Sequence, residues 1–115
     1  MIKLIQAGLV AFAMALGCGE TWAQWVSAQQ LQEYCDAEEG VFYGVCSGYI
    51  SAVADMQHFP LVMNGRKLCT PPGVDRSQLV EVVKKYLREH PEQYHFPGSF
   101  IVFEALTEAW PNACD

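Results

Sequence analysis

Cysteine is the residue type in this sequence that offers the most chemistry. Five cysteines occur, and Cys18 lies within an apolar N-terminal stretch, while the other four are Cys35, Cys46, Cys69 and Cys114. An even number of cysteines in a short exported chain is typical of a domain held together by disulfides. If the N-terminal stretch is a secretory signal, the even number of remaining cysteines predicts two disulfides and no free thiol.

The first residues have the pattern of a secretory signal peptide. Lys3 precedes an apolar run over residues 4–16, and residues 21–23 (Thr-Trp-Ala) place small side chains three and one before a cleavage point. We expect cleavage after residue 23, which leaves residues 24–115 as a helical domain outside the reducing cytosol. The apolar run is shorter than the roughly 20 residues of a membrane span, so we expect no membrane attachment after cleavage. Lipid attachment at Cys18 is the alternative.

The charge pattern narrows the class of partner. The chain has a formal net charge of −6, and the basic residues of the mature part lie between Arg66 and Arg88. An acidic protein is repelled by nucleic acid and by anionic membranes, and it suits a basic protein partner. We therefore predict no nucleic-acid partner.

Catalytic and metal-binding patterns are weak. Cys46 with a histidine could form a nucleophile pair, but a cysteine in a disulfide has no thiolate. Asp55 and His58 are three residues apart, and His90 and His95 flank a loop. Structural zinc sites use tighter sets of four Cys or His ligands. We predict no enzyme activity, no metal and no cofactor.

The spacing of apolar residues is helical nearly throughout, and no alternating strand pattern occurs. The sequence therefore predicts an all-α fold, a small domain of four helices stapled by two disulfides, with a loop over residues 61–74. The predicted helices cover residues 27–36, 42–59, 75–90 and 97–110. The predicted core stripe of the second helix is Phe42, Cys46, Tyr49, Val53 and Met56.

Local features add detail to two of these helices. Asp75 and Gln78 have the spacing of a capping box at the start of the third helix. Gly44 and Gly48 lie one turn apart in the second helix. Because glycine costs about 1 kcal/mol per helical position relative to alanine, we expect a neighbour packed close to the backbone there.

Four cysteines allow three pairings. Cys46 lies on the second predicted helix and Cys69 in the loop that follows it, so one bond would close a modest loop. Cys35 ends the first helix and Cys114 follows the last, so a bond between them would tie the ends of the domain together. We therefore predict the pairs Cys46–Cys69 and Cys35–Cys114.

One segment lies outside the helical stripes. Residues 92–96 lie between Pro91 and Pro97, which stiffen the ends of the segment. An aromatic tip of this kind is a plausible anchor in a partner's pocket. The alternative is that Phe96 and Tyr94 pack against the base of the fourth helix. The partner-binding residues that we predict are Glu92, Gln93, Tyr94 and His95.

Several motifs, taken together in their order, resemble a known family. They are Cys46-x-Gly48-Tyr49-Ile50-x-x-Val53-x-Asp55, Cys69-x-Pro71, Val82-x-x-x-Tyr86-Leu87-x-x-His90-Pro91 and Ala105-Leu106-x-x-Ala109-Trp110-Pro111. This pattern resembles the Rap/Tai immunity proteins of type VI secretion systems and covers nearly the whole mature chain. The family usually ends in Trp-Pro-Cys or Phe-Pro-Cys, whereas two further residues precede the last cysteine here.

The resemblance implies a small helical inhibitor, often dimeric, that acts in the periplasm. Such proteins bind and block a peptidoglycan amidase effector delivered by sister cells and so prevent self-intoxication. On this basis we expect a homodimer with an amidase effector as its partner. A helical acid-stress chaperone of the periplasm is the alternative from another class, and client binding at low pH would distinguish it.

Overall fold

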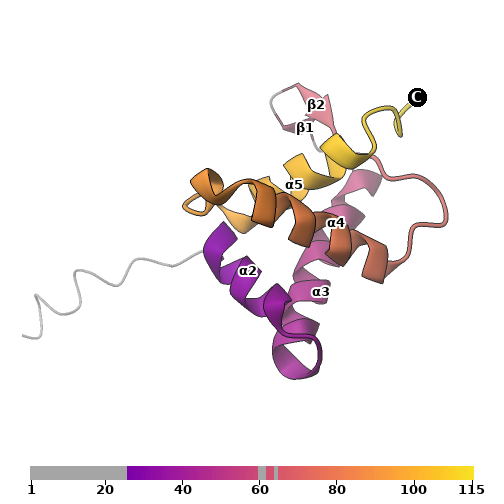
Figure 1. Ribbon diagram of the computed structural model, residues 1–115. Coiled ribbons are helices and arrows are strands. Elements are labelled where there is room, and N and C mark those ends of the chain that lie inside the picture. The colour runs from indigo at the N-terminus through magenta and orange to yellow at the C-terminus, as the bar shows by residue number, and fades with distance from the viewer. Residues whose placement is uncertain (1–25, 60–61, 64) are drawn as a thin grey trace, which may run out of the picture.

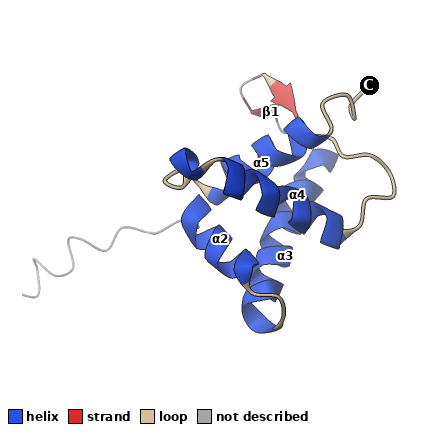
Figure 2. Ribbon diagram, viewed as in Figure 1, coloured by secondary structure: helices blue, strands red, loops and turns tan. Residues whose placement is uncertain are grey.

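The computed structural model describes residues 26–59, 62–63 and 65–115 (Figure 1). These residues are mostly helical and contain very little strand (Figure 2). The prediction of an all-α fold with four helices is therefore confirmed, whereas the predicted signal segment lies outside the described residues. The elements are α2 (Ala28–Asp36), α3 (Gly40–Asp55), η1 (Met56–His58), β1 (Val62–Met63), β2 (Arg66–Lys67), α4 (Arg76–Glu89), η2 (Pro91–Gln93) and α5 (Gly98–Ala109).

Local sequence explains where the helices begin. At α4, Asp75 and Gln78 form the predicted capping box, in which each side chain accepts a hydrogen bond from the other residue's backbone N–H. Ser27 and Gln30 form a second box at α2. α3 begins two residues earlier than predicted, at Gly40, whose φ of 82° is a conformation that glycine adopts readily.

The core is formed by apolar side chains from all four helices. α2 packs against α3, α4 packs against α5, and α3 also contacts α4 and α5. Leu68, in the loop before α4, is fully buried and anchors that loop to the helices. The largest fully buried side chains are Phe103, Leu31, Ile50, Leu68, Leu87, Ile101 and Leu106.

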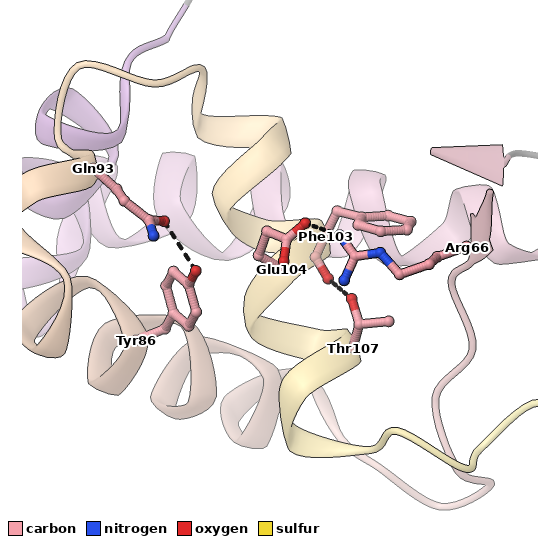
Figure 3. Close-up of polar contacts among 6 residues, drawn as sticks. All are labelled: Arg66, Tyr86, Gln93, Phe103, Glu104 and Thr107. Carbon is pink, nitrogen blue, oxygen red and sulfur yellow. Dashed lines mark hydrogen bonds and ion pairs between the residues drawn. The ribbon is translucent and has the colours of Figure 1, made fainter. Parts of the chain in front are cut away.

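The predicted loop over residues 61–74 contains a small antiparallel hairpin. Met63 pairs with Arg66 beside the turn, where Gly65 has a φ of 73°. Strands of two residues are too short to show an alternating pattern in the sequence. Arg66 forms an ion pair with Glu104 of α5 and lies 5.4 Å from the ring centre of Phe103 (Figure 3). These contacts hold the hairpin on α5.

The predicted disulfide pairing is wrong, although all four predicted cysteines form disulfides. Cys35 is joined to Cys46 with a Cα–Cα distance of 5.0 Å, and Cys69 is joined to Cys114 at 5.2 Å. The prediction assumed that the end of the chain returns to the first helix. Instead, the residues after α5 lie beside the β1–β2 hairpin, where the Cys114 sulfur is 3.6 Å from the Lys67 carbonyl oxygen (Figure 1). The short turn after α2 brings Cys35 next to Cys46.

The expectation of a close neighbour at Gly44 and Gly48 is also wrong for the described residues. A methyl group placed at either glycine would have no described atom within 4 Å apart from its chain neighbours and the backbone of its own helix. The close approach occurs at Gly98, where a methyl group would lie 3.1 Å from the Val26 carbonyl oxygen and 3.2 Å from the Tyr49 hydroxyl. The start of α5 is therefore the point at which glycine permits tight packing.

Candidate partner-binding surface

Residues 91–97, which we call the α4–α5 segment, form a compact turn between the last two helices. The segment starts with the single helical turn η2. The Gln93 N–H donates to the His90 carbonyl at 3.0 Å, and the Phe96 N–H donates to the Gln93 carbonyl at 3.0 Å. These backbone hydrogen bonds fix the shape of the segment from within.

The α4–α5 segment also caps the N-terminus of α2. The first N–H groups of a helix have no partner inside the helix. Here the Ala28 N–H donates to the Phe96 carbonyl at 2.8 Å, and the Gln29 N–H donates to the Tyr94 carbonyl at 3.1 Å. The segment is therefore tied to a helix more than sixty residues earlier in the chain. Its backbone is positioned by the fold rather than left as a free loop.

Two of the four predicted binding residues, Gln93 and Tyr94, form side-chain hydrogen bonds within the protein. The Tyr94 hydroxyl accepts a hydrogen bond from the Gln32 side chain at 2.8 Å. The Tyr86 hydroxyl donates to the Gln93 side chain at 2.9 Å, as Figure 3 shows. Burial raises the pKa of Tyr86 above its usual 10.0, so its hydroxyl keeps its proton at neutral pH. Gln93 and Tyr94 are half-buried. They hold the segment in place, and Tyr94 is hydrogen-bonded to Gln29 and Gln32 of α2.

Glu92 provides a fixed negative charge at the start of the segment. Its backbone N–H and the neighbouring His90 ring lower the pKa of the Glu92 carboxyl below 4.5. The ring nitrogen Nδ1 of His90 lies 3.0 Å from that carboxylate, and the ring stacks on Tyr86 with centres 4.1 Å apart. Glu92 is exposed, so its charge is available to a partner.

His95 and Phe96 complete the outward face. His95 is exposed, and its ring centre lies 4.4 Å from that of Phe96. Phe96 is 36% exposed and packs edge-on against Phe100 of α5 at 5.4 Å. The segment thus presents a carboxylate, an imidazole and an aromatic ring next to one another. The sequence left open whether Phe96 belongs to an aromatic tip or packs on the fourth helix, and its ring does both.

The other candidate chemistries do not assemble in the described part of the chain. Cys46 is in a disulfide and fully buried, so it carries no free thiol. Across residues 26–59, 62–63 and 65–115, no three His, Cys, Asp or Glu side chains are grouped closely enough to hold a metal ion. None of the described helices is both long and apolar enough to span a membrane.

Comparison with known protein families gives one match. Residues 27–114 match the family described as Rap1a immunity proteins. The chain belongs to this family. The match includes all four helices and both disulfides and confirms the resemblance to the Rap/Tai immunity proteins. No curated protein and no solved structure shows a significant match to the chain. Membership of an immunity family implies that the chain binds an effector as its partner.

Proposed function

We propose that this Rap1a-family protein binds a peptidoglycan amidase effector of a type VI secretion system in the periplasm and blocks its active-site groove. Family membership supports a role in immunity to an effector. The two disulfides support a location outside the reducing cytosol, as does the signal pattern over residues 1–23. Blocking a groove needs a rigid projecting surface rather than reactive groups.

The rigid α4–α5 segment is the observation that carries this proposal. Its backbone carbonyls are hydrogen-bonded to α2, while Glu92, His95 and Phe96 face outward. A surface that is already ordered loses little conformational entropy when it enters a partner. The groove of an amidase binds a peptide stem and therefore offers polar groups to a carboxylate and an imidazole. Gln93 and Tyr94 keep these outward side chains in position.

We also propose that the protein acts as a homodimer. A dimer would present two α4–α5 segments and could hold two effector molecules. Each segment is bonded to α2 and α4 of its own chain, so a single chain contains the whole proposed contact surface.

Binding and inhibition can be measured with the purified protein and the amidase effectors of its host. We expect a tight complex that stops the cleavage of muropeptides. The double variant Glu92→Ala/His95→Ala should bind at least about 30-fold more weakly, equivalent to about 2 kcal/mol, since contacts at the centre of an interface carry most of its energy. Its helical circular dichroism and melting temperature should be nearly unchanged because both side chains are exposed.

Glu33→Ala is the matched control, because Glu33 is an exposed acidic residue on α2. It should bind like the wild type. If the wild-type protein bound no amidase effector of its host, or cleaved muropeptides itself, the proposed function would be wrong. If only the double variant failed to weaken binding, the function would stand and the contact surface would lie elsewhere.

A further inference from the structure

One face of α3 carries apolar side chains that the described part of the chain leaves exposed. Val41, Phe42 and Val45 near its start are 80%, 60% and 41% exposed, and Met56 and Phe59 just beyond its end are 39% and 61% exposed. The helix of a soluble monomer normally turns polar side chains toward solvent. We call this exposed apolar surface the α3 stripe. It consists of Val41, Phe42, Gly44, Val45, Gly48 and Ala52 of α3, with Met56 and Phe59 from the turn that follows the helix.

The middle of the α3 stripe is made of small residues. Gly44, Gly48 and Ala52 are exposed and follow one another at intervals of four residues, about one helical turn. No described atom lies within 4 Å of a methyl group placed at Gly44 or Gly48, so packing within the described chain does not explain these glycines. Glycine weakens a helix relative to alanine, whereas small residues at this spacing let a second helix approach the backbone closely.

We propose that the α3 stripe is the interface through which two copies of this chain associate, with their α3 helices antiparallel and crossing near Gly48. A two-fold interface must be complementary to itself. Rotation about an axis at Gly48 places Gly44 opposite Ala52 of the second copy, so that small residues meet small residues. The larger side chains of Val41 and Phe42 then lie toward the end of the second helix, where Met56 is 39% exposed.

The charges at the ends of α3 favour this antiparallel arrangement. Asp36, Glu38 and Glu39 are exposed just before the helix, whereas Asp55 and His58 are exposed at its other end. A parallel pair would bring two clusters of three carboxylates together. An antiparallel pair separates these clusters by the ~24 Å length of a 16-residue helix, and each cluster then lies beside Asp55 and His58 rather than beside three further carboxylates.

The exposed area is of the size that an interface centre requires. Phe42 and Phe59 are 60% and 61% exposed, so together they offer about 240 Å² if each phenylalanine carries about 200 Å². The aliphatic residues of the stripe bring the patch into the ~300–600 Å² range of the largest apolar patches on soluble proteins, which are often functional. A stable interface buries about 800 Å² on each partner, with an apolar centre and a polar rim. The α3 stripe matches such a centre.

A second copy fits this patch better than a charged foreign protein. Residues 40–54 contain no charged side chain, so the stripe has no group that would select a basic or acidic partner. The α4–α5 segment is formed by other residues and remains available to an effector. This inference rests on the proposed homodimer and does not depend on which effector is bound.

Sedimentation equilibrium of the full protein, recovered from the periplasm after its own export, tests the interface. We expect the wild type to have twice the mass of one processed chain. Gly48→Leu should raise the dissociation constant of the dimer at least 100-fold, because leucine keeps the two backbones apart. Its helical signal should persist, since leucine is the better helix former and the site is open in the single chain. Glu81→Leu, at an exposed position on α4, is the control and should remain dimeric.

A cross-linking experiment tests the position of the two-fold axis. With copper-catalysed oxidation, Gly48→Cys should form a disulfide-linked dimer, while Glu81→Cys should not. A monomeric wild type at all concentrations would overturn both the homodimer and this interface. A dimer that neither dissociates with Gly48→Leu nor cross-links through Gly48→Cys would overturn the interface alone. If Gly48→Leu left the dimer intact and abolished effector binding, the stripe would be an effector surface instead.

Discussion

The two disulfides differ in exposure, and we expect a mild reductant to distinguish them. Cys35 and Cys46 are fully buried between α2 and α3, whereas Cys114 is exposed and Cys69 is half-buried. Reduction requires a thiolate to reach one of the two sulfur atoms. The Cys69–Cys114 bond can therefore be attacked in the folded protein, while attack on Cys35–Cys46 requires α2 and α3 to separate.

The consequences can be estimated from the loop that each bond closes. Cys69 and Cys114 are 45 residues apart, so by the chain-entropy estimate their disulfide contributes about 4 kcal/mol to the free energy of unfolding. Cys35 and Cys46 are 11 residues apart, and the same estimate gives about 3 kcal/mol for their disulfide. A domain of this size is stable by about 5–15 kcal/mol, so we expect it to remain helical when only Cys69–Cys114 is reduced. If separating α2 from α3 costs about 3 kcal/mol, the Cys35–Cys46 bond should be reduced about 100-fold more slowly than the Cys69–Cys114 bond.

Timed alkylation measures this difference. Folded protein is treated with a low concentration of a dithiol, quenched with an alkylating reagent at intervals, and mapped by mass spectrometry. We expect Cys69 and Cys114 to be labelled first. Urea unfolding of the partly reduced protein should then show a free energy of unfolding lower by about 4 kcal/mol, with the helical signal retained. Labelling of Cys35 and Cys46 first, or at the same rate, would refute the argument from burial.

Two further predictions concern the pH dependence and the packing of the fold. Hydrogen bonds from the Ser77 hydroxyl and the Gln78 N–H hold the pKa of the Asp75 carboxyl below 3.8. The ionised carboxylate therefore stabilises the fold fully above the pKa that Asp75 has in the unfolded chain. This stabilisation is lost as the pH falls through the lower pKa of the folded state. Melting temperatures should therefore fall less for Asp75→Asn than for the wild type between about pH 4 and pH 2, and an unchanged slope would contradict this assignment. Gly98→Ala should lower the free energy of unfolding by about 1–3 kcal/mol because of its two close contacts, whereas Glu81→Ala, at an exposed position on α4, should not. Equal losses for both variants in urea unfolding would show that these contacts are unimportant.

The helices could be predicted from the sequence because their determinants are local. The capping box of Asp75 and Gln78 and the apolar spacing that follows it lie within one or two turns of each other. The inward face of α3 could not be predicted in the same way, because this helix is apolar on nearly every side. The predicted core stripe included Phe42 and Met56, which are 60% and 39% exposed.

The details of the candidate site depend on contacts that are distant in the sequence. The two prolines around residues 92–96 indicated an unusual segment. They could not show which side chains point outward, since that depends on the hydrogen bond between Gln32 and Tyr94, residues separated by 62 positions. The disulfide pairing was wrong for the same kind of reason, because the position of Cys114 depends on how α5 packs beside the hairpin.

The observed connectivity has a consequence for how the chain matures. Each disulfide joins cysteines that are consecutive in the sequence, so the two covalent loops are neither nested nor overlapping. A chain that crosses a membrane N-terminus first presents Cys35 and Cys46 to the oxidising side before Cys69 arrives. An oxidant that acts on cysteines in order of arrival then makes the native bonds directly. If Cys35 were instead paired with Cys114, its disulfide could form only after the last residues of the chain had crossed the membrane. We therefore expect this protein to reach its native covalent structure without a disulfide isomerase.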